Sequence, residues 1–173
     1  VKNLFVFVPL FFSGNIMHLE YLYRSIFAFI IFSLTASSIY ILNDYKDIES
    51  DKKHPIKCNR PLASGAISKS SAIVTFLFLV LTVAVLIFLG QDFFHDNFYK
   101  FSIIIFCYFL MNIAYTLNLK HVAIVDIFII SIGFVLRVLA GGYATGIITS
   151  RWAILLTFVL ALVLAVGKRR GEL

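Results

Sequence analysis

The stretch AIVTFLFLVLTVAVLIFL, residues 72–89, decides the fold class, because it is apolar except for two threonines and carries no charge. A helix needs about 20 apolar residues to cross the hydrocarbon core of a bilayer. The whole chain has the same character: 61% of its 173 residues are hydrophobic and 14% are charged. Soluble chains are about half apolar and about a quarter charged. We therefore expect an all-α, polytopic transmembrane helical bundle.

Further apolar segments on both sides of this stretch bring the number of predicted spans to six. The first, Leu4–Phe12, is short, and the others are Ser25–Leu42, Phe98–Leu117, Val122–Leu139 and Trp152–Val166. No internal repeat or low-complexity tract divides them, so residues 1–173 form one expected domain. Because the chain opens mid-pattern at Val1 and stops just after a basic cluster, we expect a piece of a longer protein, truncated at both ends.

The basic residues predict how these spans are oriented. Eleven of the fifteen Lys and Arg residues fall on one side of the predicted bundle, with Lys2 counted among them. Excess Lys and Arg mark cytoplasmic loops, so we expect both termini at the cytoplasmic face of a bacterial cytoplasmic membrane. The net charge of +6 then reports topology, and we expect no nucleic-acid partner. The two cysteines predict neither a disulfide nor a metal framework.

The stretch NDYKDIESD, residues 43–51, follows the second span directly and is rich in acids. If the helix continues, Asn43, Asp47 and Asp51 fall at i, i+4 and i+8, with Asp44 beside them. Carboxylates this close repel one another and favour a cation between them. Oxygen-only ligands suit Mg²⁺, which also bridges carboxylates to phosphates. These four residues therefore predict a Mg²⁺ site, with the three carboxylates as catalytic candidates.

A basic loop follows the acids and is broken by proline and glycine. Lys57 and Arg60 lie in it, where they can contact the oxygens of a diphosphate. The alternative is that these bases serve orientation alone, as Lys and Arg often do in membrane-facing loops.

Two charged residues lie within the fifth predicted span. Asp126 and Arg137 are eleven residues apart, so they share a helix face at a separation of about 16 Å, and Gly133 lies on that face too. Ionisable residues inside a span mark functional sites by default. The alternatives are an interfacial role for Asp126 near Lys120, and extension of the Arg137 side chain to the outer membrane surface.

The ends of the fourth and sixth spans supply the remaining candidates. Tyr115 and Lys120 end the fourth span, and Lys168 and Arg169 end the sixth. Each can contact the donor or a substrate phosphate. Tyr115 can equally be an interfacial belt residue, and the basic residues can simply anchor the sixth span.

NDYKDIESD resembles the NDxxDxxxD signature of the UbiA superfamily of intramembrane transferases, and KKHPIKCNRPLASG is similar to the loop that follows it there. Three further stretches resemble one branch in particular, the decaprenyl-phosphate phosphoribosyltransferases. They are VKNLFVFVPLFFSG, YTLNLKHVAIVDIFIISIGFVLRVLAGGYATG and GKRRGEL.

The resemblance implies a nine-helix bundle around a cavity that opens to the cytoplasm, of which this chain would supply six helices. It also implies a Mg²⁺-dependent transfer of 5-phosphoribosyl from phosphoribosyl diphosphate to a polyprenyl phosphate. Asp126 would face the cavity and hold the donor or a second Mg²⁺. The resemblance leaves a homo-oligomer open.

Two alternatives to this function stay open. One is a prenyltransferase that moves a polyprenyl group from its diphosphate to an aromatic or lipid acceptor. Family members that prenylate aromatic rings carry a second Asp-rich motif where this chain has GKRRGEL, whose only acid is Glu172. The other alternative is a non-enzymatic bundle, either an inactive remnant or a cation carrier. Carriers place acids near mid-membrane, whereas the densest acids here lie at the edge.

Overall fold

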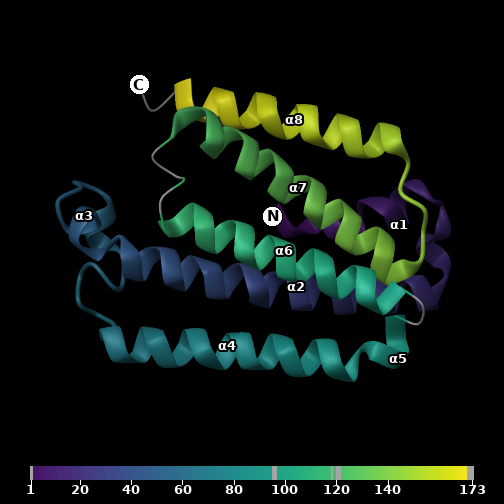
Figure 1. Ribbon diagram of the computed structural model, residues 1–173, viewed down its shortest axis with the longest axis horizontal. Coiled ribbons are helices and arrows are strands. Elements are labelled where there is room, and N and C mark those ends of the chain that lie inside the picture. Colours follow the sequence, from purple (N-terminus) through teal and green to yellow (C-terminus); the bar gives the residue numbers. More distant parts are fainter. Residues whose placement is uncertain (1, 95–96, 118, 120–121, 171–173) are drawn as a thin grey trace.

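The computed structural model describes residues 2–94, 97–117, 119 and 122–170, without the side chains of residues 123 and 168–170. Within these residues the chain is helical and contains no β-strand (Figure 1). The expected all-α class is confirmed. In chain order the helices are η1 Lys2–Phe7, α1 Val8–Phe12, η2 Asn15–Met17, α2 Leu19–Lys46, α3 Ile48–Lys52, η3 Lys57–Asn59, α4 Lys69–Leu89, α5 Gln91–Phe94, α6 Phe98–Leu117, α7 Ala123–Thr145 and α8 Arg151–Arg170.

Four described helices are long and apolar enough to cross a membrane: α2, α4, α6 and α7 from Ile124 onward. They confirm four of the six predicted spans. Lys2–Phe12 and Arg151–Gly167 are shorter apolar helices. The first of these is a 3₁₀ turn followed by one α turn, with Pro9 in the opening turn of α1. A proline is tolerated there because the first amides of a helix have no partner within the helix.

The long helices run up and down, each antiparallel to the next, so that α2 and α6 point the same way and α7 points back (Figure 1). Helix α2 lies in the centre and packs against α4, α6 and α7. In an apolar segment of 18 residues within α2, 44% of the residues are buried, whereas 11% are buried in the corresponding segment of α4. α4 therefore forms one outer edge of the bundle, and α8 lies on the opposite side of α7.

The core lies where α2, α6 and α7 meet, and small residues bring these elements close together. Ala28, Phe32 and Ala36 recur at four-residue spacing on α2 and belong with Phe101 of α6 to one cluster of buried residues. Gly141 of α7 packs directly against η1, and a Cβ atom there would collide with the carbonyl oxygen of Val6. The N-terminal segment is thus fixed against α7 by backbone contact, as small residues permit between membrane helices.

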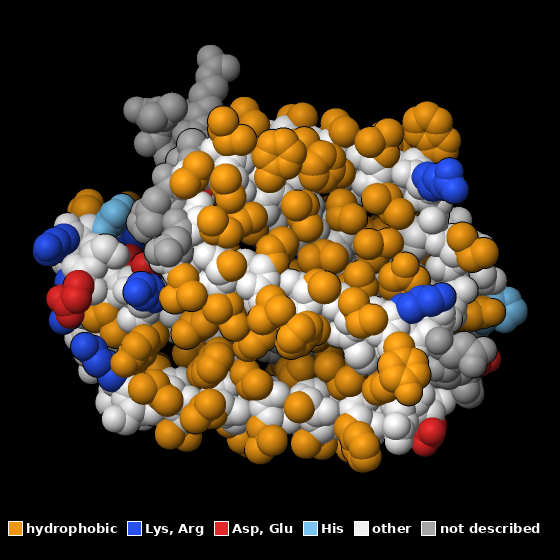
Figure 2. Space-filling model, viewed as in Figure 1, with side chains coloured by type: hydrophobic (Ala, Val, Ile, Leu, Met, Phe, Trp, Pro, Cys, Tyr) orange, Lys and Arg blue, Asp and Glu red, His pale blue; other side chains and the backbone are white. Residues whose placement is uncertain are grey.

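The surface separates into an apolar belt and two polar ends. Figure 2 shows hydrophobic side chains over the long helices and charged side chains at the two ends of the bundle. One end carries α3 and the loop around η3. Of the two ends, only this one, residues 43–60, is called the polar end below. The opposite end carries α5 and the turn between α7 and α8 (Figure 1).

Candidate functional site

The acids of the polar end lie across a break between two helices. α2 ends at Lys46, Asp47 stands between α2 and α3, and the predicted continuous helix is thus interrupted. Helical hydrogen bonds still cross the break, because the amide of Asp47 donates to the Asn43 carbonyl at 3.0 Å and that of Asp51 donates to the Asp47 carbonyl at 2.8 Å. The i, i+4, i+8 relationship among these residues is kept in the backbone.

Arg60 joins two of the predicted catalytic acids. Its Nη1 donates to Oδ1 of Asp44 at 2.8 Å and to Oδ2 of Asp51 at 3.0 Å. The Asp51 side chain is 6% exposed, while those of Asp44 and Arg60 are about one-third exposed. A turn brings Arg60 to this position, since Nδ1 of His54 accepts hydrogen bonds from the amides of Ile56 and Lys57.

This arrangement differs from the predicted cluster of carboxylates around a metal. No three Asp, Glu, His or Cys side chains of the described residues converge closely enough to hold a metal ion. Instead, a guanidinium nitrogen lies between two carboxylate oxygens, and its single positive charge offsets part of the negative charge of Asp44 and Asp51. Two oxygens that share one cationic nitrogen lie within about 6 Å of each other. Their donor type, carboxylate oxygen, suits a hard cation such as Mg²⁺. Mg²⁺ binding here stays a prediction.

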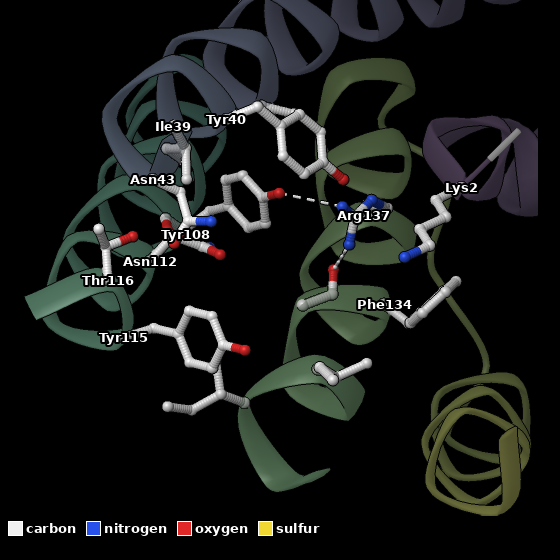
Figure 3. A pocket seen from close by; sticks show the side chains of 14 residues that line it. Lys2, Ile39, Tyr40, Asn43, Tyr108, Asn112, Tyr115, Thr116, Phe134 and Arg137 are labelled. Atoms are coloured by element: carbon white, nitrogen blue, oxygen red, sulfur yellow. Dashed lines mark hydrogen bonds between the residues drawn. The ribbon is translucent and has the colours of Figure 1, made fainter. Parts of the chain in front are cut away.

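An interior cavity of about 260 Å³ begins beside the polar end and reaches into the bundle (Figure 3). Each of three helices contributes a stripe of residues at helical spacing. Lys2 of η1 completes the lining, whereas the sequence predicted only that it lies with the bases of the cytoplasmic side. The stripes are Ala36, Ile39, Tyr40 and Asn43 of α2; Tyr108, Asn112, Tyr115 and Thr116 of α6; and Ile129, Ile130, Gly133, Phe134 and Arg137 of α7.

Arg137 forms the end of the cavity that lies farther from the polar end. The residue is 5% exposed, so the alternative in which its side chain extends to the outer surface is wrong. Its Nε donates to Oδ1 of Asn3 at 3.0 Å, its Nη1 to the Gly133 carbonyl at 2.7 Å and its Nη2 to the Tyr108 hydroxyl at 2.9 Å. Figure 3 shows the last two bonds within the cavity wall.

Asp126 lies at the end of the cavity nearer the polar end. Its Oδ1 accepts a hydrogen bond of 2.8 Å from the hydroxyl of Tyr115, which lines the cavity. Asp126 is not itself among the described lining residues, and it reaches the cavity through Tyr115. Gly133 and Arg137 do line the cavity. Two of the three residues that were predicted to share a face of α7 therefore border this cavity, and their functional role stays a prediction.

Two buried polar atoms in the cavity wall have no hydrogen-bond partner in the described structure. They are Oδ1 of Asn43 and Oγ1 of Thr116, and Thr116 is 1% exposed. Buried polar groups are nearly always hydrogen-bonded, and an unpaired one costs free energy. Both residues line the interior cavity. A polar ligand in that cavity would supply the partners they lack.

Sequence reasoning missed the polar residues of α6 other than Tyr115, and it missed Asn3. Tyr108, Asn112 and Thr116 recur every four residues inside an otherwise apolar span, and that periodicity was the available signal. Of the other predicted contacts, Lys57 is exposed at the start of η3. Lys120 lies outside the described residues. Lys168 and Arg169 belong to the last turn of α8, and their side chains are outside the described part.

Comparison with known proteins gives one consistent result. The UbiA prenyltransferase family model matches residues 5–168. The chain is 35% identical, over its full length and 56% of the relative, to decaprenyl-phosphate phosphoribosyltransferase of Mycobacterium tuberculosis. It is 36% identical, over its full length and 54% of the relative, to the protein of that name from Mycolicibacterium smegmatis. Nodulation protein NoeC of Azorhizobium caulinodans is 31% identical over 85% of the chain and 45% of that protein. The chain spans about half the length of these curated relatives.

Proposed function

The chain belongs to the UbiA prenyltransferase family, and on that basis we propose that it forms part of a Mg²⁺-dependent transferase embedded in the membrane. The transferred group is 5-phosphoribosyl, the donor is phosphoribosyl diphosphate and the acceptor is a polyprenyl phosphate. The names of the two mycobacterial relatives support this choice. So does GKRRGEL at the end of the chain, in place of a second Asp-rich motif.

The observation that carries the proposal is a polar cavity inside an apolar bundle. It begins at Asn43, next to Asp44 of the charged cluster, and its wall includes the unpartnered oxygens of Asn43 and Thr116. A site built only for hydrocarbon would leave such atoms without hydrogen bonds, at a cost of about 1–3 kcal/mol each. A ligand with hydroxyl and phosphate groups satisfies them.

The residues that would hold Mg²⁺ are Asn43, Asp44, Asp47 and Asp51. When bound, the ion stabilises the negative charge that develops on the leaving diphosphate. In the structure the Arg60 guanidinium lies where carboxylate oxygens of Asp44 and Asp51 converge. On donor binding, we expect Arg60 to exchange these carboxylates for phosphate oxygens, with Lys57 beside it in the same loop.

In the reaction, an oxygen of the acceptor phosphate bonds to the anomeric carbon of the donor while the bond from that carbon to the diphosphate breaks. The diphosphate leaves with the bonding electron pair. The acceptor oxygen is already anionic, so no strong general base is required. The protein contributes position and electrostatics: Tyr115 and Asp126 hold the donor at the polar end. Lys120, Lys168 and Arg169 are proposed contacts of the acceptor phosphate.

The active site would face the cytoplasm. Lys46, Lys52, Lys53 and Lys69 lie with Lys57 and Arg60 at the polar end or beside it, whereas the opposite end carries Arg24, Lys100 and Arg151. Basic residues concentrate on the cytoplasmic side of membrane proteins. This orientation gives the cavity access to a water-soluble, charged donor.

The test is a transfer assay on the full-length protein that contains this chain, reconstituted in lipid. Radiolabelled phosphoribosyl diphosphate, a polyprenyl phosphate and Mg²⁺ are supplied, with Asp47→Ala in parallel. We expect lipid-linked label that is lost with EDTA and falls at least a hundredfold in Asp47→Ala. Glu49→Ala is the matched control, because Glu49 lies in the adjoining helix and its ion pair among the described residues is with the exposed Lys52.

Two outcomes would contradict the proposal. Transfer from a polyprenyl diphosphate to an aromatic acceptor, without transfer from phosphoribosyl diphosphate, would assign the protein to the prenyltransferase alternative. Absence of both transfers in a folded full-length protein would favour a non-enzymatic bundle.

A further inference from the structure

Arg137 is a buried cation whose hydrogen-bond partners are all neutral. It donates to an amide oxygen, a backbone carbonyl and a phenol, from Asn3, Gly133 and Tyr108 respectively. A guanidinium stays protonated in proteins, and a buried charge without a counter-charge is costly. In the described structure Arg24 and Arg60 each form an ion pair with a carboxylate, whereas the three hydrogen bonds of Arg137 go to neutral groups. Arg137 thus differs from them in kind.

Aromatic rings offset part of this cost without cancelling the charge. The guanidinium carbon lies 5.2 Å from the ring centroid of Phe32, 5.1 Å from that of Tyr108 and 5.3 Å from that of Phe134. Cation–π contacts of this kind are favourable in a desolvated site. They leave the guanidinium charged, Lys2 adds a second basic side chain to the lining, and none of the described residues that line the cavity is Asp or Glu. The end of the cavity at Arg137, farther from the polar end, is therefore a positively charged site surrounded by apolar helices. Such a site strongly attracts an anion.

Two N–H donors of the Arg137 guanidinium are not used in its three hydrogen bonds. It has five N–H groups, and three of them are committed to the bonds above. The two that are left belong to the terminal nitrogens Nη1 and Nη2. Arginine commonly binds two oxygens of one phosphate group through two parallel bonds from its N–H groups. The three committed bonds fix the plane of the guanidinium before a ligand arrives.

The cavity has a length and a polarity that suit a ligand with an anionic group at each end. Its stripe on α2 runs from Asn43 to Ala36, about 10 Å along the helix axis. The acids of the polar end lie beside Asn43, at one end of the cavity. Arg137 lies at the opposite end of the cavity. Between them, Oγ1 of Thr116 lacks a partner among the described residues and suits a hydroxyl group of a sugar.

We propose that Arg137, held by Tyr108 and Asn3, forms a metal-independent phosphate subsite that binds the 5-phosphate of the donor. The inference rests on the proposed function, since it assigns the two ends of one donor to the two ends of the cavity. It makes Arg137 a specificity-determining residue. A polyprenyl diphosphate bound at the polar end would place hydrocarbon against the buried guanidinium, which would then have neither water nor an anion.

The experiment measures binding of ribose 5-phosphate to the full-length protein in lipid nanodiscs, with EDTA present and ribose as the blank. We expect ribose 5-phosphate to bind without Mg²⁺, and Arg137→Gln to weaken that binding at least tenfold. Arg151→Gln makes the same change at the start of α8, outside the cavity, and should leave binding within twofold of the parent protein. Unchanged binding in a folded Arg137→Gln variant would overturn the inference.

A second variant covers the case in which Arg137→Gln does not fold. Tyr108→Phe keeps the buried ring and removes the hydroxyl that accepts from Nη2. It should weaken ribose 5-phosphate about threefold to tenfold and leave Mg²⁺-dependent binding of inorganic pyrophosphate within twofold. Equal weakening of both ligands would indicate general damage to the cavity and would overturn the inference.

The results distinguish failure of the phosphate subsite from failure of the proposed function. They also distinguish a phosphate of the donor from a phosphate of the lipid headgroup. Arg137-dependent binding of ribose 5-phosphate in a protein without transferase activity would uphold the subsite and reject the function. Transfer activity together with ribose 5-phosphate binding that does not depend on Arg137 would uphold the proposed function and reject the subsite. Farnesyl phosphate supplies the last arm. If Arg137→Gln weakened farnesyl phosphate and spared ribose 5-phosphate, the subsite would belong to the lipid headgroup, and the assignment to the donor would be wrong.

Discussion

The hydroxyl of Tyr115 donates a hydrogen bond of 2.8 Å to Oδ1 of Asp126 and thereby joins the end of α6 to the start of α7. Tyr115 lines the interior cavity, whereas Asp126 is not among its described lining residues. The bond therefore connects a carboxylate to a side chain that can touch the ligand. It also fixes the relative position of the two helices whose stripes form most of the cavity wall.

Tyr115→Phe should lower transfer by at least tenfold in kcat/KM for the donor. The variant keeps the ring and removes one hydrogen bond to a charged group, which contributes about 1.5–3 kcal/mol. Every 1.4 kcal/mol corresponds to a factor of ten. The measurement is steady-state transfer with the donor concentration varied. Tyr99→Phe is the control, because Tyr99 also lies on α6 and is 76% exposed. Equal activity of the two variants would contradict a role for the Tyr115–Asp126 bond.

Gly141→Ala should destabilise the bundle and detach η1 from α7. The added methyl group would collide with the backbone carbonyl of Val6, which cannot move as the end of a flexible side chain could. Displacement of η1 would also remove Asn3 from Arg137. We expect a loss of several kcal/mol, in the upper range for single substitutions, measured by thermal unfolding in detergent. Gly167→Ala is the control, since no neighbouring atom lies within 4 Å of its Cβ position. That change should be neutral or slightly stabilising within a helix.

The sequence predicts the long helices well because their signal is local. Residues 72–89 are apolar except for two threonines, and α4 extends over Lys69–Leu89. Hydropathy does not fix where a helix ends, since backbone hydrogen bonds continue into polar sequence. α2 accordingly runs six residues before the predicted Ser25 and four residues after the predicted Leu42.

The pairing of side chains across the bundle could not be predicted in the same way. Arg60 lies sixteen residues beyond Asp44, and their contact depends on the turn that His54 organises. The burial of Arg137 depends on Asn3, which is 134 residues away in the chain. Such contacts follow from tertiary packing, and the spacing of residues within one helix carries no information about them. The face shared by Gly133 and Arg137 was predictable because it is a property of α7 alone.

Orientation can be tested with the two native cysteines. Cys58 lies in the loop of the polar end, whereas Cys107 is on the apolar surface of α6. In a Cys107→Ser background, a membrane-impermeant maleimide should label Cys58 only after the cells are opened. Gln91→Cys, in a chain that also lacks Cys58, places the probe at an exposed position of the opposite end and should be labelled in intact cells. Labelling of Cys58 in intact cells would place the polar end outside the cytoplasm.

Arg60→Gln should tighten binding of Mg²⁺ while it impairs transfer. The guanidinium now shares the oxygens of Asp44 and Asp51 with any cation that binds there, and Asp51 is 6% exposed at its side chain. Without Arg60 the two carboxylates lose their counter-charge, so the protein should unfold at a lower temperature in EDTA. Added Mg²⁺ should raise the unfolding temperature of Arg60→Gln more than that of the parent protein, because an ion that binds the folded state stabilises that state. Arg24→Gln breaks an ion pair at the opposite end and serves as control. Equal Mg²⁺ stabilisation of the parent protein and Arg60→Gln would show that the ion binds away from these carboxylates.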